Sequence, residues 1–456
     1  MAEPLLKAVK DGEIEESLVD EKVRNILRMM LRLKMIGPEK KHRKTGAYNT
    51  EEHRRAVLDV ARESMILLKN EDQVLPLQAE SGCKVAVIGA NAAAIHSNGG
   101  GSAEIKALYE ISPLMGIKKL LGGNVKVSYA PGYVIPDKKE ASEINWQAAS
   151  TETAEDTEKE STVSGRTLDE KQQEALAEAV ALAKASDIVI FVGGLNHDFD
   201  VEGPDRVNMK LPYGQDEVID ALLKAVPDTV VCMYAGAPVE MPWAEKAKAI
   251  LWSYYAGMEG GTALAEILSG KVNPSGKLAE TFIRDTSQCP AHTIGTFGKK
   301  DRVEYREGVM VGYRYYDTKK TDVLFPFGHG LSYTAFTYND LEIIRQQENG
   351  RQTVKVSCSV TNTGEHAGKE TVQIYVAPEQ KKDRPVHELK AFEKVGLDAG
   401  ETKRICVILE ERDFSHYDTD KKMPVPVNGT YEIQVGASST DICLCGKIDL
   451  FLQKVK

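Results

Sequence analysis

One loop of the sequence carries an unusual density of acidic side chains. Asp198, Asp200, Glu202 and Asp205 stand within eight residues, and Arg206 follows them directly. Crowded like charges raise the pKa of the least solvated carboxyl, which keeps a carboxylic acid protonated near neutral pH. A general acid needs that property. The pattern indicates a candidate acid/base site; a solvated acidic loop, fixed by an Asp205–Arg206 ion pair, is the alternative interpretation.

The other candidate motifs carry less chemistry. The run from Asn98 to Ser102 contains three glycines, but it is no G-x-G-x-x-G and lacks the lysine of a P-loop. It predicts a tight loop that lets the backbone approach a neighbouring domain or a ligand. Glu259 precedes a predicted helix, where a carboxylate favours the helix dipole, so we expect capping, with catalysis as the alternative. The histidines, His197 in the acidic loop included, show no metal spacing, so we expect neither a metal nor a cofactor.

Composition limits the class of protein. The chain has 456 residues, which suggests about three domains, and a net charge of −10 that disfavours nucleic acid and anionic membranes as partners. No apolar run approaches the roughly 18 residues of a membrane span, and no signal peptide is recognisable. Seven scattered cysteines fit a reducing compartment better than a disulfide framework, so we expect a cytoplasmic protein.

The elements that must position the acidic loop follow an α/β pattern. Continuous apolar runs predict four buried parallel strands, at 84–89, 187–194, 228–234 and 249–254. Helical patterns alternate with them, at 51–69, 168–185, 215–224 and 260–269. This alternation predicts a doubly wound parallel sheet, in which ligands bind beyond the carboxyl ends of the strands. The acidic loop follows such an end.

Four regions are predicted along the chain. Residues 1–48 form helices and a linker, with Ser17 as an N-cap, and 49–285 form an α/β sandwich interrupted by a polar insertion at 141–167. Residues 286–335 form an ordered linker. From residue 336 to 456, short alternating runs separated by turns predict an all-β sandwich of the fibronectin type III kind.

Together, the motifs resemble one family of enzymes. Glu202-Gly203-x-Asp205-Arg206, followed by Leu211-Pro212 and Gln215, is similar to the acid/base loop of bacterial β-glucosidases of glycoside hydrolase family three. Other matching segments run in family order over nearly the whole chain: 66–70, 75–77, 98–103, 238–243, 257–261, 273–278, 311–317 and 325–333.

The resemblance implies roles for particular residues. Glu202 matches the general acid/base of the family, and Asp205 and Arg206 are expected to bind substrate or support the loop. The family nucleophile is an aspartate on a (β/α)8 barrel, often in a Ser-Asp-Trp context, which this chain lacks. A barrel needs at least about 200 residues, and residues 1–36 resemble only its closing helices. We therefore expect a β-glucoside or oligosaccharide substrate, with a barrel domain or a second chain that supplies the nucleophile.

Two other functions stay open at this stage. The chain could be a non-catalytic carbohydrate-binding or scaffolding module derived from such an enzyme. It could also hold a complete carboxylate pair, Glu202 with Asp198 or Glu259, because retaining hydrolysis requires two carboxyl groups about 5 to 5.5 Å apart. An exposed apolar surface near the site would favour a barrel partner over a lone module.

Overall fold

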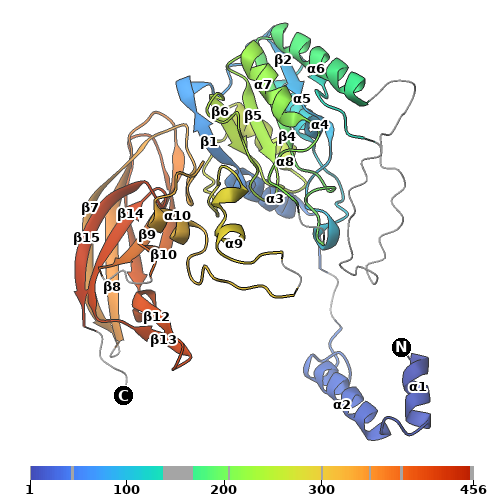
Figure 1. The fold of residues 1–456 in the computed structure, drawn as a ribbon, viewed down its shortest axis with the longest axis vertical. Coiled ribbons are helices and arrows are strands. Elements are labelled where there is room, and N and C mark those ends of the chain that lie inside the picture. The colour runs from blue at the N-terminus through green and yellow to red at the C-terminus, as the bar shows by residue number, and fades with distance from the viewer. Residues whose placement is uncertain are drawn as a thin grey trace. The chain divides into compact units, whose positions relative to one another are not determined.

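The computed structural model consists of two compact units, Met1–His53 and Arg54–Lys456 (Figure 1). It describes residues 2–42, 46–136, 168–203, 206–298, 301–348, 351–379 and 384–451. The predicted polar insertion and Asp205 lie outside these described residues. No helix among them is both long enough and apolar enough to cross a lipid bilayer.

The first unit contains two amphipathic helices, α1 (Ala2–Lys10) and α2 (Glu16–Arg32). Ser17 does not cap α2: Glu15 occupies the N-cap position, and the Ser17 hydroxyl donates to the Glu15 carboxylate at 3.1 Å. The prediction was two residues too late, because a serine within the first turn can satisfy the same short-range pattern. No residue of α2 is buried, and its apolar side chains are exposed, among them Leu18, Val23, Ile26, Leu27, Met29 and Leu31.

The second unit begins with a six-stranded sheet in the order β1-β6-β5-β4-β2-β3. Its strands are β1 (Ile66–Asn70), β2 (Lys84–Ile88), β3 (Lys126–Ala130), β4 (Ile188–Gly194), β5 (Val230–Tyr234) and β6 (Ala249–Trp252). All pairs are parallel except β1 with β6. The four predicted strands are confirmed as β2, β4, β5 and β6, whereas β1 and β3 are additional.

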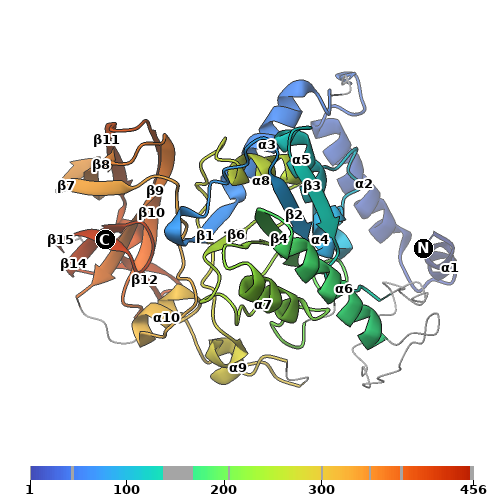
Figure 2. The ribbon, with the colours of Figure 1, turned by 90° about the horizontal axis from the view of Figure 1, so that it is seen from above.

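Helices cover both faces of this sheet. Figure 2 shows α3, α5 and α8 on one face and α6 and α7 on the other. The bounds are α3 (Glu51–Ser64), α4 (Ala90–Ala93), α5 (Pro113–Leu121), α6 (Leu168–Lys184), α7 (Gln215–Ala225) and α8 (Gly260–Leu268). Two buried hydrophobic clusters, one on each face, hold these layers together. The prediction of a helix over 51–69 was wrong beyond Ser64, because Ile66, Leu67 and Leu68 are fully buried in β1.

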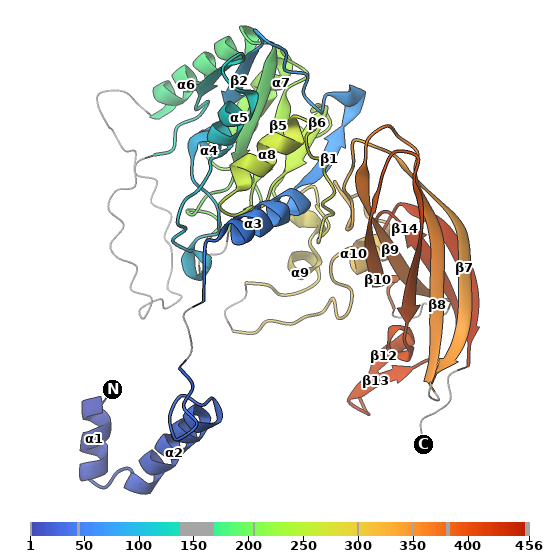
Figure 3. The ribbon, with the colours of Figure 1, turned by 180° about the vertical axis from the view of Figure 1, so that it is seen from behind.

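A polypeptide segment with two short helices, α9 (Pro290–Thr293) and α10 (Tyr313–Lys319), leads to the β-sandwich (Figure 3). One sheet has the order β10-β9-β14-β15 and the other β11-β8-β7. The strands are β7 (Phe336–Glu348), β8 (Arg351–Asn362), β9 (Gly368–Pro378), β10 (Glu388–Leu397), β11 (Thr402–Leu409), β12 (Ser415–Asp418), β13 (Met423–Pro426), β14 (Gly429–Gly436) and β15 (Ile442–Leu450). The predicted fold class, an α/β sandwich followed by an all-β fibronectin type III-like sandwich, is confirmed; the exact domain boundaries remain predictions.

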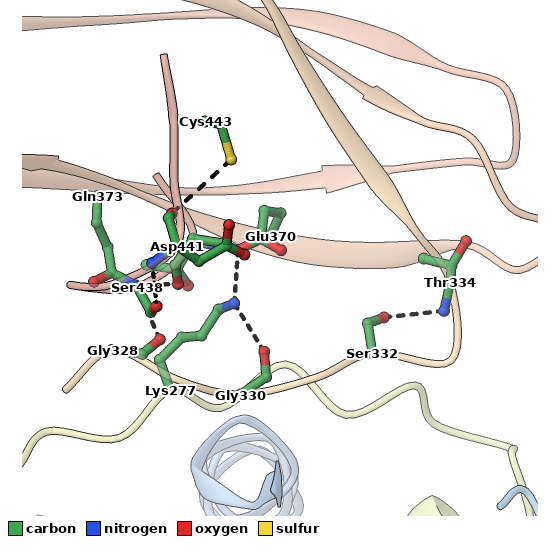
Figure 4. Close-up of polar contacts among 12 residues, drawn as sticks. Lys277, Gly328, Gly330, Ser332, Thr334, Glu370, Gln373, Ser438, Asp441 and Cys443 are labelled. Atoms are coloured by element: carbon green, nitrogen blue, oxygen red, sulfur yellow. Dashed lines mark hydrogen bonds and ion pairs between the residues drawn. The ribbon is translucent and has the colours of Figure 1, made fainter. Parts of the chain in front are cut away.

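A buried ion pair joins the β-sandwich to the α/β sandwich. The Lys277 ammonium lies 2.9 Å from the Glu370 carboxylate on β9 and donates to the Gly330 carbonyl at 2.9 Å (Figure 4). The two side chains are only 12% and 7% exposed. Burial raises the pKa of Glu370, and the charge of Lys277 opposes that rise. Each charge therefore depends on the other.

Removal of one partner should destabilise the chain strongly. We expect Glu370→Gln to lower the free energy of unfolding by about 3 to 5 kcal/mol, because Lys277 would stay buried and unpaired. The double variant Lys277→Met/Glu370→Leu should lose less free energy of unfolding than the two single variants, Lys277→Met and Glu370→Leu, lose together. Urea unfolding measures both. Glu379→Gln, in a solvent-exposed pair with Lys447, is the control and should change stability by less than about 1 kcal/mol. Additive single effects would contradict the coupling.

A second partly buried carboxyl predicts a pH dependence. Asp216, in the first turn of α7, accepts a hydrogen bond from Trp243 Nε1 at 2.8 Å, and burial raises its pKa to about 6. In the unfolded chain an aspartate has a pKa near 3.9. Between these values the folded chain holds a proton that the unfolded chain has lost, so this group lowers stability as pH rises from about 4 to 6.

Asp216→Asn should remove that slope. The variant should match the parent near pH 4 and be more stable by about 1 to 3 kcal/mol at pH 7, since the amide oxygen can still accept from Trp243. Urea unfolding at several pH values measures the difference. Glu178→Gln, an exposed change on α6, should leave the profile unaltered. A stability difference that is equal at pH 4 and pH 7 would refute the assignment.

Candidate active site

The acidic loop lies at the edge of the sheet where the parallel strands have their carboxyl ends, as predicted from the sequence. It leaves β4 at Gly194 and contacts the loops that follow β2 and β5. The Gly100 amide donates to the Asp200 carbonyl at 2.9 Å, and the Gly236 amide donates to the Asp200 carboxylate at 2.5 Å. Three segments far apart in the sequence thus meet at one edge of the sheet.

Gln215 anchors the start of the acidic loop. Its side chain is 1% exposed and bonds both main-chain groups of Gly194: the Gly194 amide donates to Oε1 and Nε2 donates to the Gly194 carbonyl, each at 2.8 Å. Nε2 also donates to the Pro212 carbonyl at 3.1 Å. The Gln215 side-chain amide thus satisfies the hydrogen-bonding groups of the backbone where the pairing between strands ends. It also connects the loop to the start of α7.

The glycine-rich segment 98–102 packs against Glu202. Gly101 has φ +72°, and a Cβ at this position would lie 2.9 Å from both the Cβ and the backbone nitrogen of Glu202. At Gly100 a Cβ would lie 3.3 Å from His197 and Val201 side-chain atoms. The predicted tight loop does permit a close approach, but the neighbour is the acidic loop of the same domain.

Glu202 is exposed and is held by a single hydrogen bond among the described residues. The Ser102 backbone amide donates to Glu202 Oε2 at 3.2 Å. The carboxylate therefore has a fixed neighbour on one side and solvent on the other. This arrangement suits a group that must reach a bound molecule and exchange a proton with it.

Two other acidic residues of the loop, Asp198 and Asp200, have structural partners. Asp200 accepts a hydrogen bond from the Tyr255 hydroxyl at 2.9 Å in addition to the Gly236 amide, and burial beside this carboxylate raises the pKa of Tyr255. Asp198 accepts from the Tyr213 hydroxyl at 3.1 Å. Two of the four clustered carboxylates thus brace the loop.

Glu259 and Arg206 each form hydrogen bonds with residues other than Glu202. Glu259 is the N-cap residue of α8, but its side chain makes no capping bond with the backbone; it accepts from Tyr109 at 2.6 Å and Thr262 at 2.7 Å. Arg206 donates to the Pro238 carbonyl at 3.1 Å. The expected Asp205–Arg206 ion pair lies partly outside the described residues, so it remains a prediction.

Two histidines bring the loops together and were not expected to do so. His197 Nε2 lies 2.8 Å from the Asn98 carbonyl oxygen, and its ring is 5.6 Å from the ring of His96. Burial lowers the pKa of His96, and its Nδ1 is buried without a hydrogen-bond partner. The segments that contain Asn98 and His197 are about 100 residues apart in the sequence, so no local pattern predicts this contact. In the described part of the chain, no three histidine, cysteine or acidic side chains are grouped as metal ligands.

Comparisons with known proteins agree with this architecture. Residues 65–333 match the model of the glycosyl hydrolase family 3 C-terminal domain, and residues 370–439 match that of the fibronectin type III-like domain. Thermostable beta-glucosidase B of Acetivibrio thermocellus is 38% identical over 441 residues, which cover 96% of this chain and 53% of that protein. Beta-glucosidase BoGH3A of Bacteroides ovatus is also 38% identical, covering 96% and 56%.

Solved structures show the same similarity. The GH3 beta-glucosidase of Bifidobacterium adolescentis aligns with a TM-score of 0.78 and 32% identity, covering 100% of this chain and 62% of its own. DesR, a beta-glucosidase from Streptomyces venezuelae in complex with D-glucose, aligns with a TM-score of 0.83 and 27% identity, covering 98% and 66%. The chain spans about half the length of the sequence relatives it matches. It belongs to glycosyl hydrolase family 3 and corresponds to a C-terminal portion of its β-glucosidases.

Proposed function

We propose that this chain supplies the general acid/base of a retaining β-glucosidase, and that Glu202 is that residue. The observation that carries the proposal is the exposed Glu202 carboxylate at the carboxyl edge of the sheet, fixed by the Ser102 amide and the Gly101 backbone. It matches the acid/base glutamate of the family motif that this sequence resembles. The β-glucosidase names of its relatives suggest a terminal β-D-glucosyl substrate.

The chemistry requires one carboxyl group to act twice. Protonated Glu202 gives its proton to the glycosidic oxygen while a nucleophile attacks the anomeric carbon and the leaving group departs. The resulting carboxylate then takes a proton from the water that hydrolyses the glycosyl-enzyme intermediate. Asp205 and Arg206 follow on the same loop, where we propose that they support it or contact the substrate.

The nucleophile is proposed to come from a barrel domain, on the same parent chain or on a partner. Exposed apolar side chains support a docking surface of this kind: Ile95, Ile105, Leu108 and Phe199 belong to the two loops that meet at Glu202, and Ile105 is 70% exposed. Exposed apolar side chains that gather on one face are a feature of interaction sites. Without that partner, we expect this chain to be inactive.

A carboxylate pair within this chain is the less favoured alternative. Asp198 and Glu259 were the candidate partners of Glu202, and both accept hydrogen bonds from tyrosine hydroxyls of their own surroundings, Tyr213 and Tyr109. A non-catalytic module derived from the enzyme is the second alternative. It predicts saccharide binding that is indifferent to Glu202, which the following experiment separates from catalysis.

The test fuses this chain to the part of the Acetivibrio relative that it does not match, where the proposal expects the barrel, and follows hydrolysis of aryl β-glucosides. Glu202→Gln should lower kcat about 10²- to 10⁴-fold on a substrate with a poor leaving group, because the general acid is lost. A substrate with a good leaving group should be affected less, and azide should partly restore its turnover. Glu104→Gln, an exposed change on the neighbouring loop, should retain full activity. Equal activity of the Glu202 and Glu104 variants would exclude Glu202 as the acid/base.

The glycine segment gives a second prediction about the same carboxylate. Gly101→Ala should destabilise the chain by more than about 1 kcal/mol, because alanine is strained at φ +72° and its Cβ meets the Glu202 backbone. In the fusion it should also lower kcat. Gly99→Ala is the matched control, since its Cβ would meet nothing nearer than 3.8 Å. Hydrogen exchange of the Ser102 amide should quicken only in the Gly101 variant. Identical exchange in both variants would show that the contact does not hold the loop.

A further inference from the structure

Segment 98–102 is joined to the acidic loop at every second residue. The three hydrogen-bonded pairs are Asn98 with His197 at 2.8 Å, Gly100 with Asp200 at 2.9 Å, and Ser102 with Glu202 at 3.2 Å. The pairs follow the same order along both segments, so the two segments lie alongside each other in one register. Because a single residue separates successive pairs in segment 98–102, a shift at the first pair displaces the last.

The three pairs differ in the groups that they use. The middle pair joins two backbone groups and uses no side chain. The Ser102 pair uses the carboxylate of Glu202, the candidate acid/base itself. The Asn98 pair uses the imidazole of His197, a residue that the proposed chemistry does not involve. His197 is thus the side chain that can fix the register without taking part in the reaction.

The His197 ring is the donor in its pair. A carbonyl oxygen can only accept, so Nε2 of His197 carries the proton that the Asn98 carbonyl receives. The neutral imidazole with its proton on Nε2 and the doubly protonated imidazolium both supply this donor. The contact therefore requires a donor at the Nε2 position, and it does not require a charge on the ring.

Both ends of the His197–Asn98 bond are held by further contacts. Asn98 Nδ2 donates to the Ser97 hydroxyl at 3.0 Å and to the Ile105 carbonyl at 3.1 Å. On the other side, the His197 ring is half-buried, and its centroid lies 5.6 Å from that of the His96 ring. Burial lowers the pKa of His96, which favours its neutral form and avoids a charge beside His197. A bond between two held groups fixes the distance between the segments that carry them.

We propose that His197 is a positioning residue for Glu202: its bond to the Asn98 carbonyl sets the register in which the Ser102 amide meets the Glu202 carboxylate. This role rests on the proposed function of Glu202. A general acid must lie within hydrogen-bond reach of the oxygen that it protonates, and a misplacement of about 1 Å can lower the rate about 10²-fold. His197 itself neither contacts the substrate nor transfers a proton.

Two substitutions of His197 separate the position of the donor from the loss of the ring. Glutamine carries its amide nitrogen near the place of Nε2, whereas asparagine carries it near the place of Nδ1. In the fused enzyme, His197→Asn should lower kcat at least about tenfold on an aryl β-glucoside with a poor leaving group, and less on one with a good leaving group. His197→Gln should recover most of that loss. His416→Asn, an exposed change on β12, is the control and should match the parent.

Hydrogen exchange measures the register in the full chain, without the fused part. The buried Gly100 amide, which donates to the Asp200 carbonyl, should exchange at least about tenfold faster in His197→Asn than in the parent, because local opening becomes easier. In His197→Gln it should exchange at nearly the parent rate. Unchanged exchange of this amide in His197→Asn would show that the His197 contact does not set the register, and would overturn the positioning role.

A double variant separates the positioning role from a general effect on the fold. His197→Asn/Glu202→Gln should be no slower than Glu202→Gln alone, because the group that His197 positions is then missing. A further loss in the double variant, or a loss in His197→Asn that is equal for good and poor leaving groups, would overturn the positioning role. Full activity of His197→Asn in an enzyme that Glu202→Gln impairs would also overturn it, and would leave Glu202 as the acid/base. Full activity of Glu202→Gln would instead refute the proposed function, and the positioning role would fall with it.

Discussion

The candidate site depends on one constraint, the close contact between the backbones of two loops. At Gly101, the space that a side chain would need is taken by the Glu202 backbone, and the amide of the next residue, Ser102, reaches the Glu202 carboxylate. A positively charged neighbour could also fix a carboxylate, but it would favour the ionised form and hinder proton donation. A backbone amide orients the group with less bias. The glycines therefore position Glu202 without assigning it a counter-ion.

The described acidic side chains of the loop make different contacts. Asp198 and Asp200 each accept a hydrogen bond from a tyrosine, and Asp200 also accepts one from the Gly236 amide after β5. These contacts brace the loop on the sheet. Glu202, two residues further on, is left exposed. Acidic side chains that look equivalent in the sequence thus have different surroundings, because the loop presents them to different neighbours.

The sequence predicted the elements better than the contacts between them. The strands β2, β4, β5 and β6 are continuous apolar runs with polar boundaries, and the pattern suffices for each. Ile66 to Leu68 follow α3 with one residue between, so their apolar pattern continued the helix. The pairing with β6 that makes them a strand depends on residues more than 180 positions away. The contact of Gly101 with Glu202 has the same character. Local sequence patterns indicate whether a segment favours a helix or a strand, whereas such long-range pairings arise only when the whole sheet forms.

The exposure of Glu202 and the exposure of its apolar neighbours have one explanation under the proposed function. A general acid works best where water is excluded, because stray water competes for the proton and weakens the electrostatic interactions of the transition state. Here the carboxylate faces solvent, and Ile105, Leu108 and Phe199 stand exposed on the same two loops. A surface that docks there would bury these side chains, exclude water from Glu202 and bring the second carboxyl group within the distance that a retaining mechanism requires. The same interface would then stabilise the complex and bring the two carboxyl groups together, so the free energy gained from apolar burial would assemble the active site.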